Sequence, residues 1–168
     1  EDHWALEYIN KLFTMGVVQG KSETTFAPDD KITRAEMVKI AVLTFGGEIT
    51  EGATPSYKDV KADDWYAPYL ALAETAKVID KATNFRPNDP ITRAEALKIL
   101  LVASAKSLDG ADAASFKDVK ASDWFSNYVN FAFANEIVSG KSATMFAPGD
   151  NITRAEMAKI AVLTFELK

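Results

Sequence analysis

Three arginines stand where the sequence predicts that helices begin. Each belongs to the same pentapeptide, Ile-Thr-Arg-Ala-Glu, which occurs at 32–36, 91–95 and 152–156. The three arginines are Arg34, Arg93 and Arg154. Because the helix dipole places partial positive charge at a helix start, an arginine there costs a few tenths of a kcal/mol, up to about 1 kcal/mol. The pattern therefore predicts that an anion lies near each arginine.

Two kinds of anion could pair with these arginines. An aspartate lies four residues upstream of each one, and pairing with it would be the commoner, structural outcome. These aspartates are Asp30, Asp89 and Asp150. Alternatively, the guanidinium and unpaired N–H groups of the helix start could together bind the carboxylate of a ligand. The residues alone leave both hypotheses open.

Tryptophans recur in register with the pentapeptides, at Trp4, Trp65 and Trp124. A tryptophan near a helix start more often packs in the core or between repeats. If it is partly exposed, it can instead offer a flat platform for a sugar ring. Lysines also recur within the helices that follow the pentapeptides, and they either reach the same end or extend into solvent. These lysines are Lys39, Lys98 and Lys159.

The composition narrows the possible functions. The chain has 168 residues, 48% of them hydrophobic and 26% charged, as in a globular protein with a buried core. Its net charge of −5 disfavours a nucleic-acid binder, which needs a basic face. No apolar run is long enough to span a membrane, and no signal peptide is visible.

Catalytic and metal sites lack the residue types that they need. There is no cysteine and a single histidine, His3, which we expect at the surface. The aspartate-bearing segments do not follow the pattern of a calcium loop, and there is no glycine-rich phosphate loop. The sequence therefore predicts a protein without catalytic activity, metal or cofactor.

The chain consists of three copies of one unit of about 60 residues. We predict repeats at 1–47, 57–105 and 116–168, which together form one compact unit. The lead-in "YKDVKADDW" of repeat 2 recurs as "FKDVKASDW" in repeat 3, whereas repeat 1 begins at "EDHW". Other residues in register are Phe26, Phe85, Phe146, Pro28, Pro87 and Pro148.

Each repeat is predicted to contain two helices and a connecting loop. In repeat 1 the first helix is expected at about 4–15, followed by Gly16 as its stop. The second helix begins at the pentapeptide, with a capping box in which threonine and glutamate satisfy backbone N–H groups. The capping boxes are Thr33 with Glu36, Thr92 with Glu95, and Thr153 with Glu156. The second helices are apolar nearly all round, which indicates burial and a mainly α, pseudo-threefold helical bundle.

The chain resembles the S-layer homology family, in an array of three motifs. The resemblance rests on the aromatic-x-Asp-Val lead-in, the helix-start tryptophan, Phe-x-Pro and Ile-Thr-Arg-Ala-Glu, and it covers nearly the whole chain. It implies an extracellular module of the bacterial cell surface, cell wall or S-layer, with grooves between adjacent repeats. It also implies a pyruvylated secondary cell-wall polysaccharide as partner, bound through its ketal-pyruvate sugar. The ligand-binding residues carried over are Arg34, Arg93, Arg154, Trp4, Trp65, Trp124, Gly20 and Gly140.

Some features depart from the family pattern. The loop of repeat 2, "VIDKATNF", is two residues shorter than its counterparts and has no glycine, so we expect its groove to be altered or unused. Repeat 1 begins without the lead-in of the other repeats, so we also expect a change in the groove that the segment would help to build. An alternative function is a self-assembly module, or one that binds other S-layer subunits, in which the arginines pair only with Asp30, Asp89 and Asp150. A wall-active hydrolase has little support.

Overall fold

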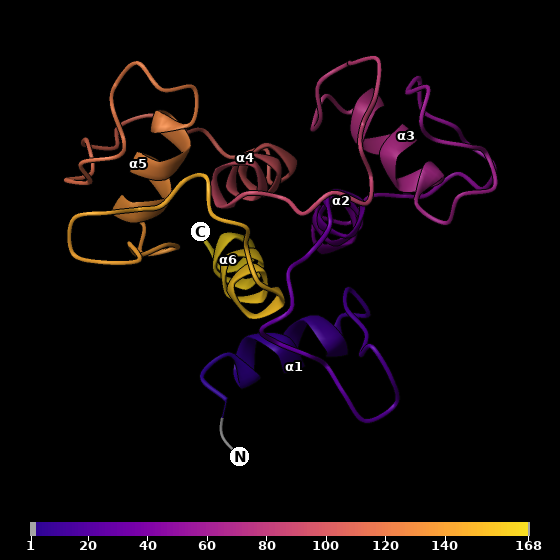
Figure 1. Ribbon diagram of the computed structural model, residues 1–168, viewed down its shortest axis with the longest axis horizontal. Coiled ribbons are helices and arrows are strands. Elements are labelled where there is room, and N and C mark those ends of the chain that lie inside the picture. Colours follow the sequence, from indigo (N-terminus) through magenta and orange to yellow (C-terminus); the bar gives the residue numbers. More distant parts are fainter. Residues whose placement is uncertain (1–2, 168) are drawn as a thin grey trace.

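The computed structural model describes residues 3–167 and is mainly helical, as predicted (Figure 1). The outermost residues of the predicted repeats 1–47 and 116–168, namely 1–2 and 168, lie outside the described range. The helices within it are α1 (Leu6–Thr14), α2 (Arg34–Thr44), α3 (Ala67–Thr75), α4 (Arg93–Ala103), α5 (Ser126–Ala134) and α6 (Arg154–Glu166). Among the described helices, none is long and apolar enough to cross a membrane.

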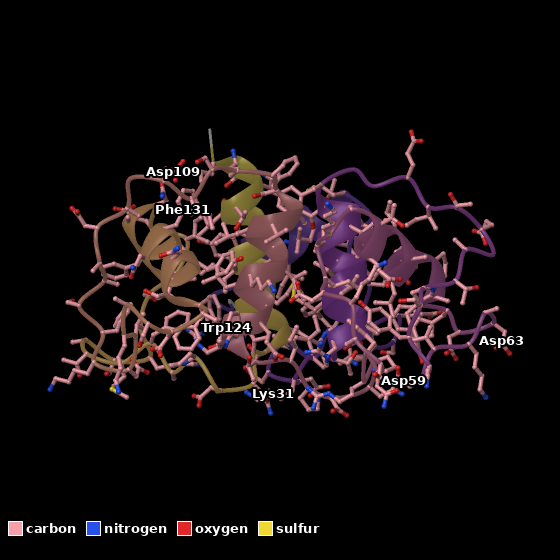
Figure 2. All side chains as sticks on the ribbon, turned by 90° about the horizontal axis from the view of Figure 1, so that it is seen from above. Lys31, Asp59, Asp63, Asp109, Trp124 and Phe131 are labelled. Carbon is pink, nitrogen blue, oxygen red and sulfur yellow. The ribbon has the colours of Figure 1, made fainter. Side chains whose placement is uncertain are left out.

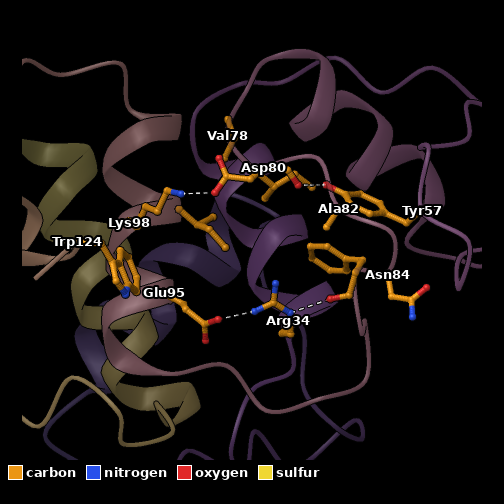
Figure 3. A pocket seen from close by; sticks show the side chains of 12 residues that line it. Arg34, Tyr57, Val78, Asp80, Ala82, Asn84, Glu95, Lys98 and Trp124 are labelled. Carbon is orange, nitrogen blue, oxygen red and sulfur yellow. Dashed lines mark hydrogen bonds and ion pairs between the residues drawn. The ribbon is translucent and has the colours of Figure 1, made fainter.

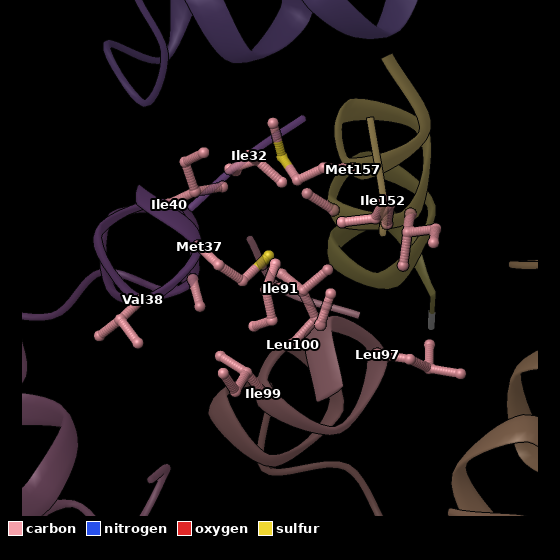
Figure 4. Close-up of a cluster of buried hydrophobic side chains, with 14 of the residues drawn as sticks. Ile32, Met37, Val38, Ile40, Ile91, Leu97, Ile99, Leu100, Ile152 and Met157 are labelled. Atoms are coloured by element: carbon pink, nitrogen blue, oxygen red, sulfur yellow. The ribbon is translucent and has the colours of Figure 1, made fainter. Parts of the chain in front are cut away.

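The helices that start at the pentapeptides form the centre of the bundle. Helices α2, α4 and α6 surround a common axis, and α1, α3 and α5 lie outside them (Figure 1). Met37, Leu100 and Met157 are fully buried between the inner helices (Figure 4). Burying one such side chain stabilises the fold by roughly 1.5–3 kcal/mol, which explains why these helices are apolar on nearly every face.

Each outer helix packs on the inner helix of the preceding repeat. Helix α3 packs on α2, α5 packs on α4, and α1 packs on α6, so the first repeat closes the ring against the last. Figure 2 shows the inner helices from the side, with Lys31 and Trp124 toward the end where these helices begin. All three helix starts therefore lie at one end of the bundle.

Backbone hydrogen bonds tie the three pentapeptides together around the axis. The N–H of Ile32 donates to the carbonyl of Ile152 (3.3 Å), that of Ile152 to Ile91 (3.1 Å), and that of Ile91 to Ile32 (3.1 Å). All three isoleucines are fully buried. Each bond joins residues from different repeats, so the ring requires all three repeats.

The first N–H groups of the inner helices are all paired. The capping boxes predicted from the sequence are present at all three starts. In α2, the N–H of Arg34 donates to the carbonyl of Asp89 (3.0 Å), and that of Ala35 donates to Pro87 (3.0 Å). The equivalent bonds occur at α4 and α6. The hypothesis that unpaired helix-start N–H groups bind a ligand is therefore wrong, because the neighbouring repeat already occupies them.

The acceptor carbonyls are presented by a strained turn in each repeat. The residue between Phe and Pro has positive φ, namely 55° at Ala27, 59° at Arg86 and 60° at Ala147. The left-handed conformation costs a non-glycine residue about 1–2 kcal/mol. The turn persists because it aims the following carbonyls at the helix start of another repeat.

Replacing Ala147 by glycine is expected to stabilise the protein. The substitution Ala147→Gly removes the steric cost of φ 60° and should raise the free energy of unfolding by about 0.5–1 kcal/mol in urea denaturation. As a control, Ala62→Gly alters an exposed alanine without positive φ and should be neutral or destabilising. Equal effects of the two substitutions would contradict the strain at this turn.

Candidate functional site

Three grooves lie between the repeats, and we name each after the repeat that supplies its loop and inner helix. The repeat-1, repeat-2 and repeat-3 grooves have volumes of ≈ 230, ≈ 400 and ≈ 250 Å³. Each one takes its arginine from the preceding repeat and its tryptophan from the following repeat, counted around the ring. The repeat-3 groove, for example, combines Arg93 of repeat 2, Gly140 and Lys159 of repeat 3, and Trp4 of repeat 1.

All eight residues that the family resemblance carried over line these grooves. The repeat-1 groove contains Arg154, Gly20 and Trp65, and the repeat-2 groove contains Arg34 and Trp124. The glutamates of the capping boxes line the grooves as well: Glu36, Glu95 and Glu156. Neither the capping threonines nor the aspartates before the pentapeptides are among the lining residues.

Arg34 is held by repeat 2 (Figure 3). Its Nη1 donates to the Glu95 carboxylate at 2.8 Å, and its Nε donates to the carbonyl of Phe85 at 2.9 Å. The guanidinium lies over the Phe85 ring, 4.9 Å from its centroid. These contacts fix the guanidinium as a rigid wall of the repeat-2 groove.

Arg93 makes the corresponding contacts with repeat 3. It is 5% exposed and donates to the carbonyls of Phe146 (3.2 Å) and Ser139 (3.2 Å) and to the carboxylate of Glu156 (3.5 Å). Burial lowers the pKa of Arg93, and the charge of Glu156 offsets part of this effect. Since guanidinium has five N–H donors, some remain for a ligand.

Arg154 closes the ring against repeat 1. Its Nε donates to the carbonyl of Phe26 (2.9 Å) and its Nη2 donates to that of Gln19 (2.7 Å), with the Phe26 ring centroid 4.2 Å away. Burial lowers the pKa of Arg154, and the charge of Glu36 opposes that shift. All three arginines therefore span the boundary to another repeat.

The aspartate pairing considered from the sequence is not what the structure shows. Where an arginine of the described chain forms an ion pair within a groove, its partner is a glutamate from the next repeat's pentapeptide, as in Arg34–Glu95 and Arg93–Glu156. The carboxylates of Asp30, Asp89 and Asp150 belong to exposed residues. These aspartates act through their main-chain carbonyls, which accept hydrogen bonds from the backbone N–H groups of the three arginines.

The groove glutamates are held ionised. Burial raises the pKa of Glu95, but hydrogen bonds from Thr92 and the charge of Arg34 outweigh burial, so the pKa lies below its ordinary value of 4.5. The same balance applies to Glu156, where Lys141 and the Thr153 N–H make the main opposing contributions. The groove cations therefore face a full negative charge at neutral pH.

The tryptophans are exposed rather than packed in the core. Trp4, Trp65 and Trp124 are 57%, 53% and 56% exposed, so the alternative that they pack in the core is wrong. Lys39 lies 5.6 Å from the centroid of Trp65, and Lys98 lies 6.0 Å from that of Trp124. The repeat-1 and repeat-2 grooves thus offer an aromatic face beside a cation.

Gly20 and Gly140 allow the groove loops to fold tightly. A Cβ atom on Gly20 would lie 2.4 Å from the carbonyl oxygen of Ser22, and one on Gly140 would lie 2.3 Å from that of Ser142. No larger residue fits without moving the backbone. The loop of repeat 2 has no glycine, and there the Tyr57 hydroxyl donates to the Asp80 carbonyl (2.7 Å).

Two aspartates that support the grooves were not singled out from the sequence. Both oxygens of Asp59 accept backbone N–H groups, from Phe85 (2.7 Å) and Arg86 (2.7 Å), and Asp118 does the same in repeat 3. They hold the turn that carries the arginine-binding carbonyl. Their recurrence in "YKDV" and "FKDV" was the available signal.

Comparison with known proteins identifies the family. Residues 1–38, 56–97 and 115–158 match the S-layer homology domain, so the chain belongs to that family. An amylopullulanase of Thermoanaerobacterium thermosulfurigenes is 36% identical over 95% of this chain, and the exoglucanase XynX of Acetivibrio thermocellus is 35% identical over 95%. An S-layer protein of Bacillus thuringiensis subsp. finitimus is 31% identical over 97%.

The matched region is a small part of each relative. The chain spans 9%, 15% and 20% of the lengths of these three proteins. Two of them are named as enzymes, yet the shared part is the S-layer homology region. The family and the S-layer relatives assign the chain to the cell surface or cell wall, as an anchoring module.

Replacing Glu156 by glutamine tests the electrostatics of the groove. Glu156 accepts hydrogen bonds from Lys141, Arg93 and the Thr153 N–H, so Glu156→Gln should lower the free energy of unfolding by about 1–2 kcal/mol at pH 7. Because the folded pKa lies below 4.5, this stabilisation is present above pH 4.5 and is lost as the pH falls through the folded value.

Urea denaturation of both proteins at pH 7 and at pH 3 measures this difference. The deficit of the variant should shrink at pH 3. Glu23→Gln, at an exposed position in the repeat-1 loop, is the matched control and should behave like the parent protein. An equal deficit at both pH values would contradict the assigned pKa shift.

Proposed function

We propose that the module attaches its parent protein to the cell wall by binding pyruvylated secondary cell-wall polysaccharide in the grooves between repeats. The observation that carries the proposal is the repeated pairing of an exposed tryptophan with a cluster of cations. In the repeat-3 groove these are Trp4 with Arg93, Lys141 and Lys159. A sugar ring can stack on the indole while its ketal carboxylate reaches the cations.

The two kinds of cation have different roles in this proposal. The arginines are held by main-chain carbonyls and line the groove as fixed charges. Lys159 and Lys39 are half-buried and less constrained, so they can adjust to the ligand. A fixed guanidinium supplies orientation, and a flexible ammonium supplies additional attraction.

The acidity of the chain limits how binding occurs. A protein with net charge −5 gains no long-range attraction toward an acidic polymer. Recognition must then come from short-range contacts within each groove. We propose modest affinity for each groove and strong attachment only when one polymer occupies more than one of them.

Removing an aromatic platform should weaken binding without unfolding the protein. Because Trp4 is 57% exposed, Trp4→Ala should keep the circular dichroism spectrum and lower the affinity of the repeat-3 groove about tenfold. Titration calorimetry with a pyruvate-ketal oligosaccharide measures the affinity. Lys120→Ala, at an exposed residue outside all three grooves, is the control and should leave binding unchanged.

The ketal carboxylate can be tested on the polymer itself. Chemical removal of the pyruvate from purified wall polysaccharide should abolish most co-sedimentation with the protein. Undiminished binding to the depyruvylated polymer would overturn the pyruvate part of the proposal. Loss of binding by Trp4→Ala and Lys120→Ala alike would overturn the assignment to this groove.

A second candidate, contact between subunits of a surface layer, is favoured by a surface of repeat 1 that bears exposed apolar side chains. Leu6, Phe13 and Met15 are exposed there. In repeat 3 the residue matching Phe13 is Phe133, which packs edge-on against Phe116 at 5.0 Å. Light scattering tests this candidate, because a protein that stays monomeric at high concentration would exclude self-assembly through this face.

A further inference from the structure

The three grooves differ in charge. The repeat-1 groove is lined by Arg154, Lys21 and Lys39 against one carboxylate, that of Glu36. The repeat-3 groove has the same balance of three cations and one carboxylate. The repeat-2 groove has two of each, because Asp80 stands among its lining residues. Two grooves are therefore cationic and the third is neutral.

Both cations of the repeat-2 groove already have carboxylate partners (Figure 3). Arg34 is paired with Glu95 at 2.8 Å, and Lys98 is paired with Asp80 at 2.5 Å. An incoming carboxylate would have to displace these partners and would meet two negative charges. The groove therefore disfavours the anionic ligand that suits the other two.

Asp80 stands directly before the shortened part of the repeat-2 loop. It matches Gln19 of repeat 1 and Ser139 of repeat 3, each of which follows a buried valine. The carbonyls of Gln19 and Ser139 accept hydrogen bonds from the groove arginine. The Asp80 carbonyl accepts instead from Tyr57. The change of residue and the change of hydrogen bonding thus occur together.

The repeat-2 groove nevertheless keeps the features of a sugar site. It has the largest volume, ≈ 400 Å³, and one side is formed by Trp124 (Figure 3). Val78, Ile79 and Ile99 add apolar surface to its lining. Carboxylates such as those of Asp80 and Glu95 can accept hydrogen bonds from sugar hydroxyls, and indole faces stack on sugar rings.

We infer that the repeat-2 groove binds an uncharged sugar, whereas the repeat-1 and repeat-3 grooves bind the carboxylate-bearing one. This inference rests on the proposed function, because it takes the grooves as sugar sites. One polymer that alternates neutral and acidic sugars would then be bound by grooves of two kinds. The carboxylate of Asp80 adapts the repeat-2 groove to another ligand rather than inactivating it.

Each groove contains one tryptophan, so three indole N–H signals can report the grooves separately. The chain has three tryptophans in total, and single Trp→Phe variants assign their signals in a nitrogen-15 correlation spectrum. The probes are a pyruvate-ketal hexose and its methyl ester, which differ in charge and little else. The acid should shift the signals of Trp4 and Trp65, and the ester should shift that of Trp124.

Two reciprocal substitutions test the role of Asp80. Asp80→Asn should let the acid shift the Trp124 signal, with an affinity about three- to tenfold higher than in the parent protein. Ser139→Asp places a carboxylate at the matching, exposed position of the repeat-3 groove and should weaken the response of Trp4 to the acid by a similar factor. Trp65 is the internal control in both variants.

The outcomes separate this inference from the proposed function. If the acid shifts Trp124 as strongly as Trp4 and Trp65, or if Asp80→Asn changes nothing, the charge argument is overturned. If Trp124 responds to neither probe while Trp4 and Trp65 respond to the acid, the inference fails and the proposed function stands. If none of the three signals responds to either probe, the proposed function itself fails.

Discussion

The hydrogen-bonded junction between each inner helix start and its neighbouring repeat is the constraint on which the rest of the structure depends. At α2, the N–H groups of Arg34 and Ala35 donate to carbonyls of repeat 2, and the guanidinium binds Phe85 and Glu95 there. Backbone bonds among Ile32, Ile91 and Ile152 close the ring. A single repeat would expose these groups and the apolar side chains of its inner helix to water, and it would lose both the hydrogen bonds and the burial that the ring provides.

The grooves follow from the same junction. The arginine that joins two repeats forms one wall, and the turn just before the outer helix of the third repeat brings a tryptophan to the other side. In the repeat-3 groove the two walls carry Arg93 of repeat 2 and Trp4 of repeat 1, and Trp4 reaches this groove because α1 packs on α6. A ligand in this groove would contact all three repeats, so binding and the closed ring should stabilise each other.

Local features of the structure could be predicted from the sequence, and distant ones could not. Thr33 and Glu36 cap a helix through groups three residues apart, so the pattern alone located each inner helix start. The partner of Arg34 is Glu95, 61 residues away, and only the closed ring brings the two together. The exposure of the tryptophans could not be predicted from the sequence either, because it depends on how α1, α3 and α5 pack on other repeats. The family resemblance pointed to the groove residues. It could not show that the cations of the repeat-2 groove are paired with carboxylates, because this depends on where the folded chain places Asp80.

The central claim is that each groove is a composite of three repeats that recognises a wall sugar. A crystal structure of the chain with a bound pyruvate-ketal oligosaccharide tests it most directly. The account predicts a sugar ring on Trp4 of repeat 1, with its carboxylate near Arg93 of repeat 2 and Lys159 of repeat 3. A sugar bound through one repeat alone, or away from the tryptophans, would contradict it.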